Sequence, residues 1–210
     1  NNTFTEFFSQ GDVSAYQYFS DQSNGMFTPQ FDVYGPYDLS GNRRIYGGND
    51  ANGDDKGVGL MVAEGCLGLD NNIDFSQYDN NGDGECDVVI VLYAGDGEAS
   101  SYADDCEYAV WPCQWSLSSS DYGKELNLDG TIVNKFAVFN ELNGSDLSRI
   151  DGIGTFCHEF SHCLDLPDFY DTQSGPHFGM GDWSLMDGGS YNNDGYTPIG
   201  YSAYEKAFMG

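Results

Sequence analysis

Two of the three histidines in this chain stand four residues apart, in the segment His158-Glu159-Phe160-Ser161-His162. On an α-helix, residues i and i+4 share one face, with their Cβ atoms roughly 5–6 Å apart. Two imidazoles at that separation can ligate one tetrahedral metal ion such as zinc. Glu159 follows the first imidazole, where its carboxylate can reach a metal-bound water. The spacing predicts a zinc site with Glu159 as general base; the alternative is a chance match between two surface histidines.

A third metal ligand is expected ten residues after His158. Pro167 must end the helix, because proline lacks an amide donor and restricts the residue before it. Asp168 then stands at the offset that the extended metalloprotease pattern H-E-x-x-H-x-x-G-x-x-H gives to its third ligand, and aspartate is an ordinary zinc ligand. Asp168 could instead cap the next turn, and Asp171 is a rival ligand at a less usual offset. The glycine of the pattern is replaced by Asp165, which tolerates a positive φ better than most residues.

A methionine follows in a glycine-rich stretch, DWSLMDGGSY (182–191). A methionine in a tight turn after the zinc helix is the Met-turn of this protease class, and Met186 would form an apolar floor beneath the metal. A buried methionine in an ordinary loop is the alternative. Tyr191, at the end of the stretch, is a candidate for stabilising the oxyanion beside the metal, but core packing is the role that we favour for it.

The acidic loop DNNGDGECD (79–87) has the spacing of a calcium site. Oxygen-bearing side chains alternate along it, and Gly84 allows the sharp turn that calcium loops need. The expected ligands are Asp79, Asn81, Asp83, the backbone carbonyl of Glu85, and Asp87. Asp87 would replace the glutamate that such loops usually carry three residues later. A plain Asn-Gly turn is the alternative, and a weaker alternation at residues 50, 52 and 54 favours a solvated loop.

Hydrophobic periodicity predicts the elements that position these side chains. Apolar residues recur on one face over residues 58–69 and 152–164, which predicts two helices. The β-branched run at 87–93 predicts a buried central strand, and residues 31–34 and 135–142 predict further strands. Short helices are expected within residues 3–20, and irregular structure from Pro167 onward. Mixed strands and helices of this kind predict an α+β domain.

Composition restricts the class of protein. The 210 residues include 34 acidic and 7 basic ones, a formal net charge of −27, which argues against nucleic acid or an anionic membrane as a partner. The longest apolar run, residues 88–94, is too short to span a bilayer. Among six cysteines, Cys106 and Cys113 are close enough in sequence to clip a short loop by a disulfide bond. Cys157 and Cys163 would lie on different helix faces and are expected to be packing residues.

Five segments resemble, in order, the immune inhibitor A family of secreted bacterial zinc metallopeptidases. They are DQSNGMFTPQFDVYGP (21–36), YDNNGDGECDVVIVLYAGDGEA (78–99), GIGTFCHEFSHCLDLPDFYD (152–171), FGMGDWSLMDGGSYN (178–192) and YTPIGYSAYEKAFMG (196–210). The resemblance implies a metzincin-like zinc metalloprotease catalytic domain with a twisted mixed sheet, a backing helix, an active-site helix and a loop-rich C-terminal subdomain. The residues that it assigns to the site are His158, His162 and Asp168 as zinc ligands, Glu159 as base and Met186 in the Met-turn. Asp165 and Cys113 depart from the family pattern, which usually has glycine and often has histidine there.

The expected organisation is a single catalytic domain over residues 1–210. Residues 1–163 would form an N-terminal subdomain with the sheet and the zinc helix, and residues 164–210 a C-terminal subdomain with the third ligand and the Met-turn. Members of the family usually have a strand before Asn1 and sequence after Gly210, so both ends are expected to be trimmed.

The predicted function is a secreted zinc endopeptidase that hydrolyses peptide bonds through a zinc-bound water, with Glu159 as general base. Zinc is the expected catalytic cofactor and calcium a structural one. Proteins or peptides are the expected substrates, with neither nucleic acid nor membrane insertion, for a monomer outside the cell or on the bacterial cell surface. The alternative is a catalytically impaired, calcium-stabilised binding domain of the same fold. A glycosidase with paired carboxylates ranks lower, because it leaves the two histidines unexplained.

Overall fold

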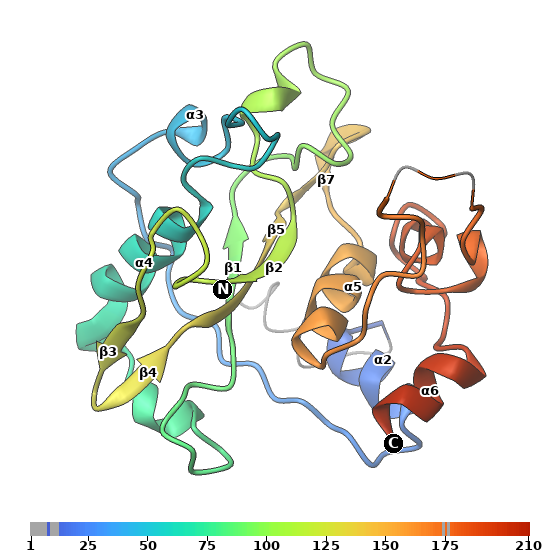
Figure 1. Ribbon diagram of the computed structural model, residues 1–210, viewed down its shortest axis with the longest axis horizontal. Helices are drawn as coiled ribbons and strands as arrows, with labels where there is room; N and C mark the ends of the chain where they lie inside the picture. Colours follow the sequence, from blue (N-terminus) through green and yellow to red (C-terminus); the bar gives the residue numbers. More distant parts are fainter. Residues whose placement is uncertain (1–7, 9–12, 174, 176) are drawn as a thin grey trace. The chain divides into compact units, whose positions relative to one another are not determined.

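The computed structural model describes residue 8, residues 13–173, residue 175 and residues 177–210 (Figure 1). The chain divides into two compact units, one formed by Asn1–Val33 with Asp151–Gly210 and the other by Tyr34–Ile150. Helices and strands are both present, so the expected α+β class is confirmed. A single catalytic domain with a subdomain boundary at residue 163 stays a prediction.

The unit formed by residues 34–150 is built on a three-stranded mixed sheet with the strand order β1-β5-β2. β5 (Lys135–Asn140) pairs in parallel with β1 (Val89–Tyr93) and antiparallel with β2 (Cys113–Ser116) (Figure 1). All residues of β5 after the first are buried, so β5 is the central strand of this sheet. The expectation that residues 87–93 form the central strand is wrong, because β1 lies at an edge of this sheet and is mostly half-buried. A β-branched apolar run predicts strand structure but not the position of the strand in a sheet.

One helix of this unit packs against the sheet. α4 (Val58–Leu69) confirms the helix predicted over the same residues, and its apolar side shares one buried core with Phe136 and Val138 of β5. At the start of α4 the amides of Gly59 and Leu60 donate hydrogen bonds of 2.7 and 3.2 Å to the carboxylate of Asp121. A carboxylate at a helix N-terminus satisfies amides that have no partner within the helix and favours the helix dipole.

Short elements complete this unit. Antiparallel pairs join β3 (Leu126–Leu128) to β4 (Thr131–Val133) and β6 (Leu142–Asn143) to β7 (Asp146–Ile150). The remaining helical elements are α3 (Arg43–Tyr46) and the 3₁₀ turns η1 (Asp70–Asn72), η2 (Phe75–Tyr78) and η3 (Cys106–Tyr108).

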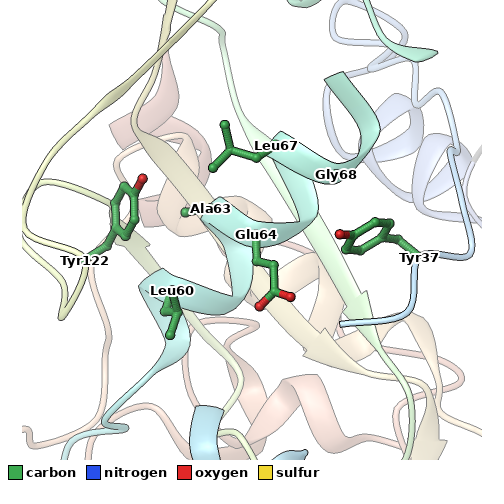
Figure 2. Close-up of a pocket in the computed structure, with 7 residues that line it drawn as sticks. All are labelled: Tyr37, Leu60, Ala63, Glu64, Leu67, Gly68 and Tyr122. Carbon is green, nitrogen blue, oxygen red and sulfur yellow. The ribbon is translucent and has the colours of Figure 1, made fainter. Parts of the chain in front are cut away.

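The outer side of α4 lines a hollow of about 340 Å³ (Figure 2). Tyr37 and Tyr122 flank it, and its lining from the helix is Leu60, Ala63, Glu64, Leu67 and Gly68. Gly68 is needed for the close approach of Tyr37, because an added Cβ would stand 2.1 Å from the tyrosine ring. Glu64, the charged residue of the lining, already accepts hydrogen bonds from the Tyr46 hydroxyl and the Ser40 amide.

Two local predictions are wrong. Residues 31–34 form no strand: the ring of Phe31 packs 5.2 Å from that of Phe156, while Val33 is exposed. None of the six cysteines is joined to another by a disulfide bond, so the expected Cys106–Cys113 disulfide is not formed. Cys106 begins η3, whereas Cys113 opens β2 and packs against the core of its own unit. Cys157 and Cys163 are buried, as expected of packing residues.

The unit formed by residues 1–33 and 151–210 contains α2 (Ala15–Gln22) and α5 (Ile153–Cys163). α5 confirms the helix predicted over 152–164. α2 confirms a short helix within residues 3–20, although residues 3–7 and 9–12 lie outside the described part of the chain. The two helices pack through Phe19 and Phe160, whose ring centroids are 5.1 Å apart. Burial of such aromatic pairs contributes strongly to a core.

The tail after Pro167 is largely irregular, as expected, with the 3₁₀ turns η4 (Gly181–Trp183) and η5 (Gly188–Tyr191). It ends, however, in a helix that was not expected from the sequence, α6 (Ala203–Met209), which begins with a capping box between Ser202 and Glu205. Among the described residues, no helix is long and apolar enough to cross a membrane.

Candidate metal centre

One face of α5 is buried, and the two histidines lie on a face that is only partly covered. Its buried side chains include Phe156, Cys157 and Phe160, whereas His158 and His162 are only half-buried. The start of the helix lies against the backbone at residues 190–195: an added Cβ on Gly154 would stand 1.9 Å from the carbonyl oxygen of Ser190. Glycine at this position therefore lets the C-terminal tail approach the helix that carries the histidines.

The helix ends in a left-handed turn at Asp165, which has φ +70°. The Leu166 amide donates to the Ser161 carbonyl at 3.1 Å, and the Asp165 amide to the His162 carbonyl at 2.9 Å. These bonds satisfy carbonyls that the end of a helix would leave without partners, as in a Schellman motif. The left-handed exit predicted for Asp165 is confirmed, and it redirects the chain toward Pro167 and Asp168.

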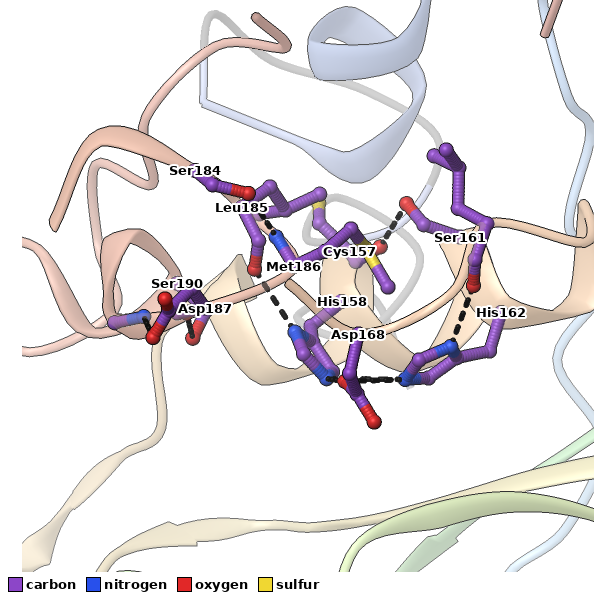
Figure 3. Close-up of polar contacts among 12 residues, drawn as sticks. Cys157, His158, Ser161, His162, Asp168, Ser184, Leu185, Met186, Asp187 and Ser190 are labelled. Carbon is purple, nitrogen blue, oxygen red and sulfur yellow. Dashed lines mark hydrogen bonds and ion pairs between the residues drawn. The ribbon is translucent and has the colours of Figure 1, made fainter. Parts of the chain in front are cut away.

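His158, His162 and Asp168 converge on one point (Figure 3). The two Nε2 atoms are 3.1 Å apart, and Oδ1 of Asp168 lies 3.4 Å from Nε2 of His158 and 3.2 Å from Nε2 of His162. Over the described residues, this is the group of histidine, cysteine and acidic side chains placed closely enough to hold a metal ion. Asp168, rather than the rival Asp171, is the carboxylate in it.

The protonation of the imidazoles follows from their other nitrogens. Nδ1 of His158 lies 2.8 Å from the carbonyl oxygen of Leu185, and Nδ1 of His162 lies 2.7 Å from that of Leu166. A carbonyl oxygen only accepts, so each neutral ring carries its proton on Nδ1. Both Nε2 lone pairs then face one another and the buried Oδ1 of Asp168, which has no donor. Three convergent acceptors repel unless a cation stands between them, so this donor set fits a divalent metal ion.

Protons compete for the same position. Burial lowers the pKa of both histidines, but the Asp168 carboxylate and the charge of Glu159 outweigh it, and both pKa values lie above the ordinary one. Burial raises the pKa of Asp168, yet the two imidazoles hold it well below its usual range. The centre therefore attracts positive charge, as a proton or as a metal ion.

The turn at residues 184–187 fixes this centre from the side of the tail. Met186 is fully buried, as expected of a Met-turn residue, and its carbonyl accepts the amide of Phe169 at 2.9 Å. Leu185 of the same turn supplies the carbonyl that holds His158 (Figure 3). One turn thus positions both a histidine and the residue that follows Asp168.

Glu159 and two tyrosines surround the centre. Glu159 is buried, and its charge helps to raise the pKa of both histidines. Burial raises the pKa of Tyr191, and the charge of Glu159 adds to that shift. Tyr191 is 54% exposed, so the core-packing role favoured for it from the sequence is wrong. Tyr170 was not identified from the sequence: burial and the negative charge of Asp168 raise its pKa. Its position two residues after Asp168 was the available signal.

In the acidic loop at residues 79–87, no three acidic or cysteine side chains bring their ligand atoms within 4.8 Å of one another. The Asp79 carboxylate accepts the amides of Gly82, Asp83 and Gly84, at 2.7 to 3.0 Å. The Asp87 carboxylate accepts the side-chain amide of Asn80. These bonds give the loop a defined shape, and its calcium stays a prediction.

Comparison with known proteins places the whole chain in context. The family model described as immune inhibitor A peptidase M6, catalytic domain, matches residues 1–210. Immune inhibitor A of Bacillus thuringiensis subsp. alesti is 29% identical over 224 residues, which cover 92% of this chain and 31% of that protein. Pre-pro-metalloprotease PrtV of Vibrio cholerae serotype O1 (strain M66-2) is 29% identical over 222 residues, covering 94% of this chain and 23% of that protein. The chain therefore spans less than a third of the length of either relative.

Proposed function

This chain belongs to the immune inhibitor A family of M6 peptidases, and from that premise we propose that it is the catalytic domain of a secreted zinc endopeptidase. Its substrates are proteins, cleaved within the chain. The zinc ligands are His158, His162 and Asp168, Glu159 is the general base, and the fold is that of a metzincin, with Met186 in the Met-turn.

The observation that carries this proposal is the geometry of the three ligands. Two imidazole nitrogens without protons and one buried carboxylate oxygen meet within 3.4 Å of one another, and each imidazole is held in that tautomer by a backbone carbonyl. Carbonyl partners of this kind are typical of metal-binding histidines. A packing role would not need three acceptors to face each other.

When bound there, zinc supplies Lewis acidity, which lowers the pKa of water from 15.7 to near 7 and polarises the scissile carbonyl. Glu159 takes the proton of the attacking water and passes it to the leaving amine, a contribution of roughly 10²–10⁴-fold. Its burial next to two imidazoles keeps this proton transfer out of bulk solvent. Tyr191 and Tyr170 are the side chains available to stabilise charge on the carbonyl oxygen, through their hydroxyl groups.

The direct test is the pair Glu159→Gln and Glu159→Ala, assayed for zinc content and for casein cleavage. Both variants retain one zinc per chain, because the three ligands are untouched, and both lose cleavage by at least 10²-fold. Cleavage of casein at the parent rate by either variant would show that Glu159 is not the base. A zinc-free parent chain that still cleaves casein would remove the zinc mechanism altogether.

Two further parts of the proposal are separate from catalysis. Calcium bound by Asp79, Asn81, Asp83, the Glu85 carbonyl and Asp87 would hold the 79–87 loop just before β1. The protein acts outside the cell or on the bacterial surface. An impaired binding domain was suggested by Asp165, but Asp165 adopts the left-handed turn that the ligand geometry needs, which removes that reason.

A further inference from the structure

We propose that Glu205 is a positioning residue of the metal centre: its buried carboxylate fixes the 184–187 turn and thereby holds His158 in the orientation that binds metal. The inference rests on the proposed zinc function. No metal-ligand pattern and no periodicity in the sequence connects Glu205 with the histidines, which lie more than forty residues earlier.

Glu205 is fully buried, with 0% of its surface exposed. Burying a carboxylate is costly unless both of its oxygens are hydrogen-bonded. Oε1 accepts the Ser184 hydroxyl at 2.7 Å and also faces the Met186 amide at 3.5 Å, while Oε2 accepts the amide of Ser202. Each oxygen therefore has a donor, and the two oxygens serve two different parts of the chain.

The bond to Ser202 belongs to the capping box of α6 and accounts for one oxygen only. A capping box needs no more than a glutamate at the surface of a helix end. The other oxygen reaches a residue 21 positions earlier in sequence, and that contact explains why Glu205 is buried. It is directed at the turn that carries Leu185.

The Ser184 hydroxyl connects Glu205 with the backbone of the 184–187 turn. It donates to Glu205. At the same time it accepts the Met186 amide at 3.1 Å, so the residues on both sides of Leu185 are held (Figure 3). The Leu185 carbonyl, fixed between them, lies 2.8 Å from Nδ1 of His158. A continuous set of hydrogen bonds thus runs from α6 to a metal-binding imidazole.

This arrangement makes Glu205 act on the metal through His158. A backbone carbonyl that holds Nδ1 fixes both the tautomer and the ring orientation, and loss of such outer partners typically costs 10–100-fold in metal affinity. Glu205 touches neither metal nor substrate in this scheme, so its effect is on affinity for the ion and on the histidine tautomer.

The test compares Glu205→Ala, Ser184→Ala and their double variant with Glu205→Gln and Ser202→Ala. Zinc affinity is measured by competition with a chromogenic chelator, and the fold by circular dichroism. Glu205→Ala and Ser184→Ala each lose about 10–100-fold in zinc affinity. The double variant loses no more affinity than the more strongly affected of the two single variants, because both substitutions act on one turn. Glu205→Gln stays within about threefold, since its amide oxygen still accepts the Ser184 hydroxyl.

Ser202→Ala is the matched control. It removes the cap of α6 and lowers thermal stability, but the contact with Ser184 survives and zinc affinity is unchanged. If Glu205→Ala does not fold, Ser184→Ala carries the test, because a hydroxyl deletion leaves the buried carboxylate in place. Folded Ser184→Ala protein with parental zinc affinity would overturn the proposal, as would an equal loss in Ser202→Ala.

A second readout separates this inference from the zinc function. In the metal-free chain, at a pH high enough for the His158 ring to be neutral, ¹⁵N chemical shifts report which ring nitrogen carries the proton. Parent protein shows the proton on Nδ1, and Ser184→Ala shows a mixture of tautomers. If the parent protein binds no zinc, but Ser184→Ala still changes the His158 tautomer, the proposed function is refuted and the positioning role remains. An unchanged tautomer in Ser184→Ala would refute the positioning role, whatever the zinc affinity.

Discussion

Substitutions at Asp165 test how strongly the proposed zinc centre depends on the turn that ends α5. The residue is exposed and adopts φ +70°, so a replacement changes backbone energetics with little change in packing. For a residue with a Cβ, this conformation costs roughly 1–2 kcal/mol, and for a β-branched residue roughly 2–3 kcal/mol. Aspartate lies at the low end of this range, because its short polar side chain bonds locally.

The expected order follows from these costs. Asp165→Gly removes the φ penalty but adds chain entropy in the unfolded state, so the free energy of unfolding changes by less than about 1 kcal/mol. Asp165→Val carries the full cost of a positive φ for a β-branched residue. The turn sets both the Leu166 carbonyl that holds His162 and the approach of Asp168. A penalty of about 2–3 kcal/mol that appears in binding corresponds to roughly 30–150-fold weaker zinc.

The assay measures urea unfolding of the zinc-loaded protein together with zinc affinity by chelator competition. If the turn at residue 165 changes its conformation, the ligands are displaced and the penalty appears in zinc affinity. If the turn keeps its conformation, the strain lowers the free energy of unfolding. The sum of the two losses in Asp165→Val therefore reaches about 2 kcal/mol relative to Asp165→Gly. Equal values for the two variants in both measurements would refute the link between the exit turn and the ligands.

Three further outcomes are expected. Met186→Ala lowers the free energy of unfolding by about 2–5 kcal/mol and Met186→Leu by less than about 1.5, because the side chain is fully buried; equal urea midpoints would contradict this. Burial raises the pKa of Asp55 to about 7, so folding favours its protonated form and stability falls as pH rises from about 4 through 7. In Asp55→Asn the decrease in the free energy of unfolding over this pH range should be smaller by about 1–2 kcal/mol, a value that allows for solvent screening. Parallel pH–stability curves for parent and variant would exclude this contribution of Asp55. Calcium added after EDTA should restore part of the melting temperature in the parent but not in Asp83→Ala; no response in the parent would count against the loop site.

The convergence of His158, His162 and Asp168 could be predicted from sequence because the relevant structure is local. Helical spacing brings His158 and His162 together, and Pro167 forces a turn that brings Asp168 to them within ten residues. The replacement of glycine by Asp165 was predicted to permit a left-handed exit, and it does. Short-range rules suffice wherever ligands lie on one helix and the turn after it.

Long-range contacts escaped prediction. The edge position of β1 depends on pairing with β5, whose residues lie 47 positions away in the register Val89–Phe136. The carbonyl of Leu185 that holds His158 is a backbone group and leaves no mark on residue type. α6 did carry a signal, since Ser202-x-x-Glu205 is a capping-box pattern, but the surrounding glycine-rich composition concealed it.

The proposed function depends on the binding of one zinc ion by His158, His162 and Asp168. Crystals of the zinc-loaded chain, measured with X-rays on both sides of the zinc absorption edge, test it directly. One anomalous peak is expected about 2.0–2.2 Å from Nε2 of His158, Nε2 of His162 and a carboxylate oxygen of Asp168. An absence of anomalous density among the three side chains, or Asp168 turned away from a zinc held by other residues, would contradict it.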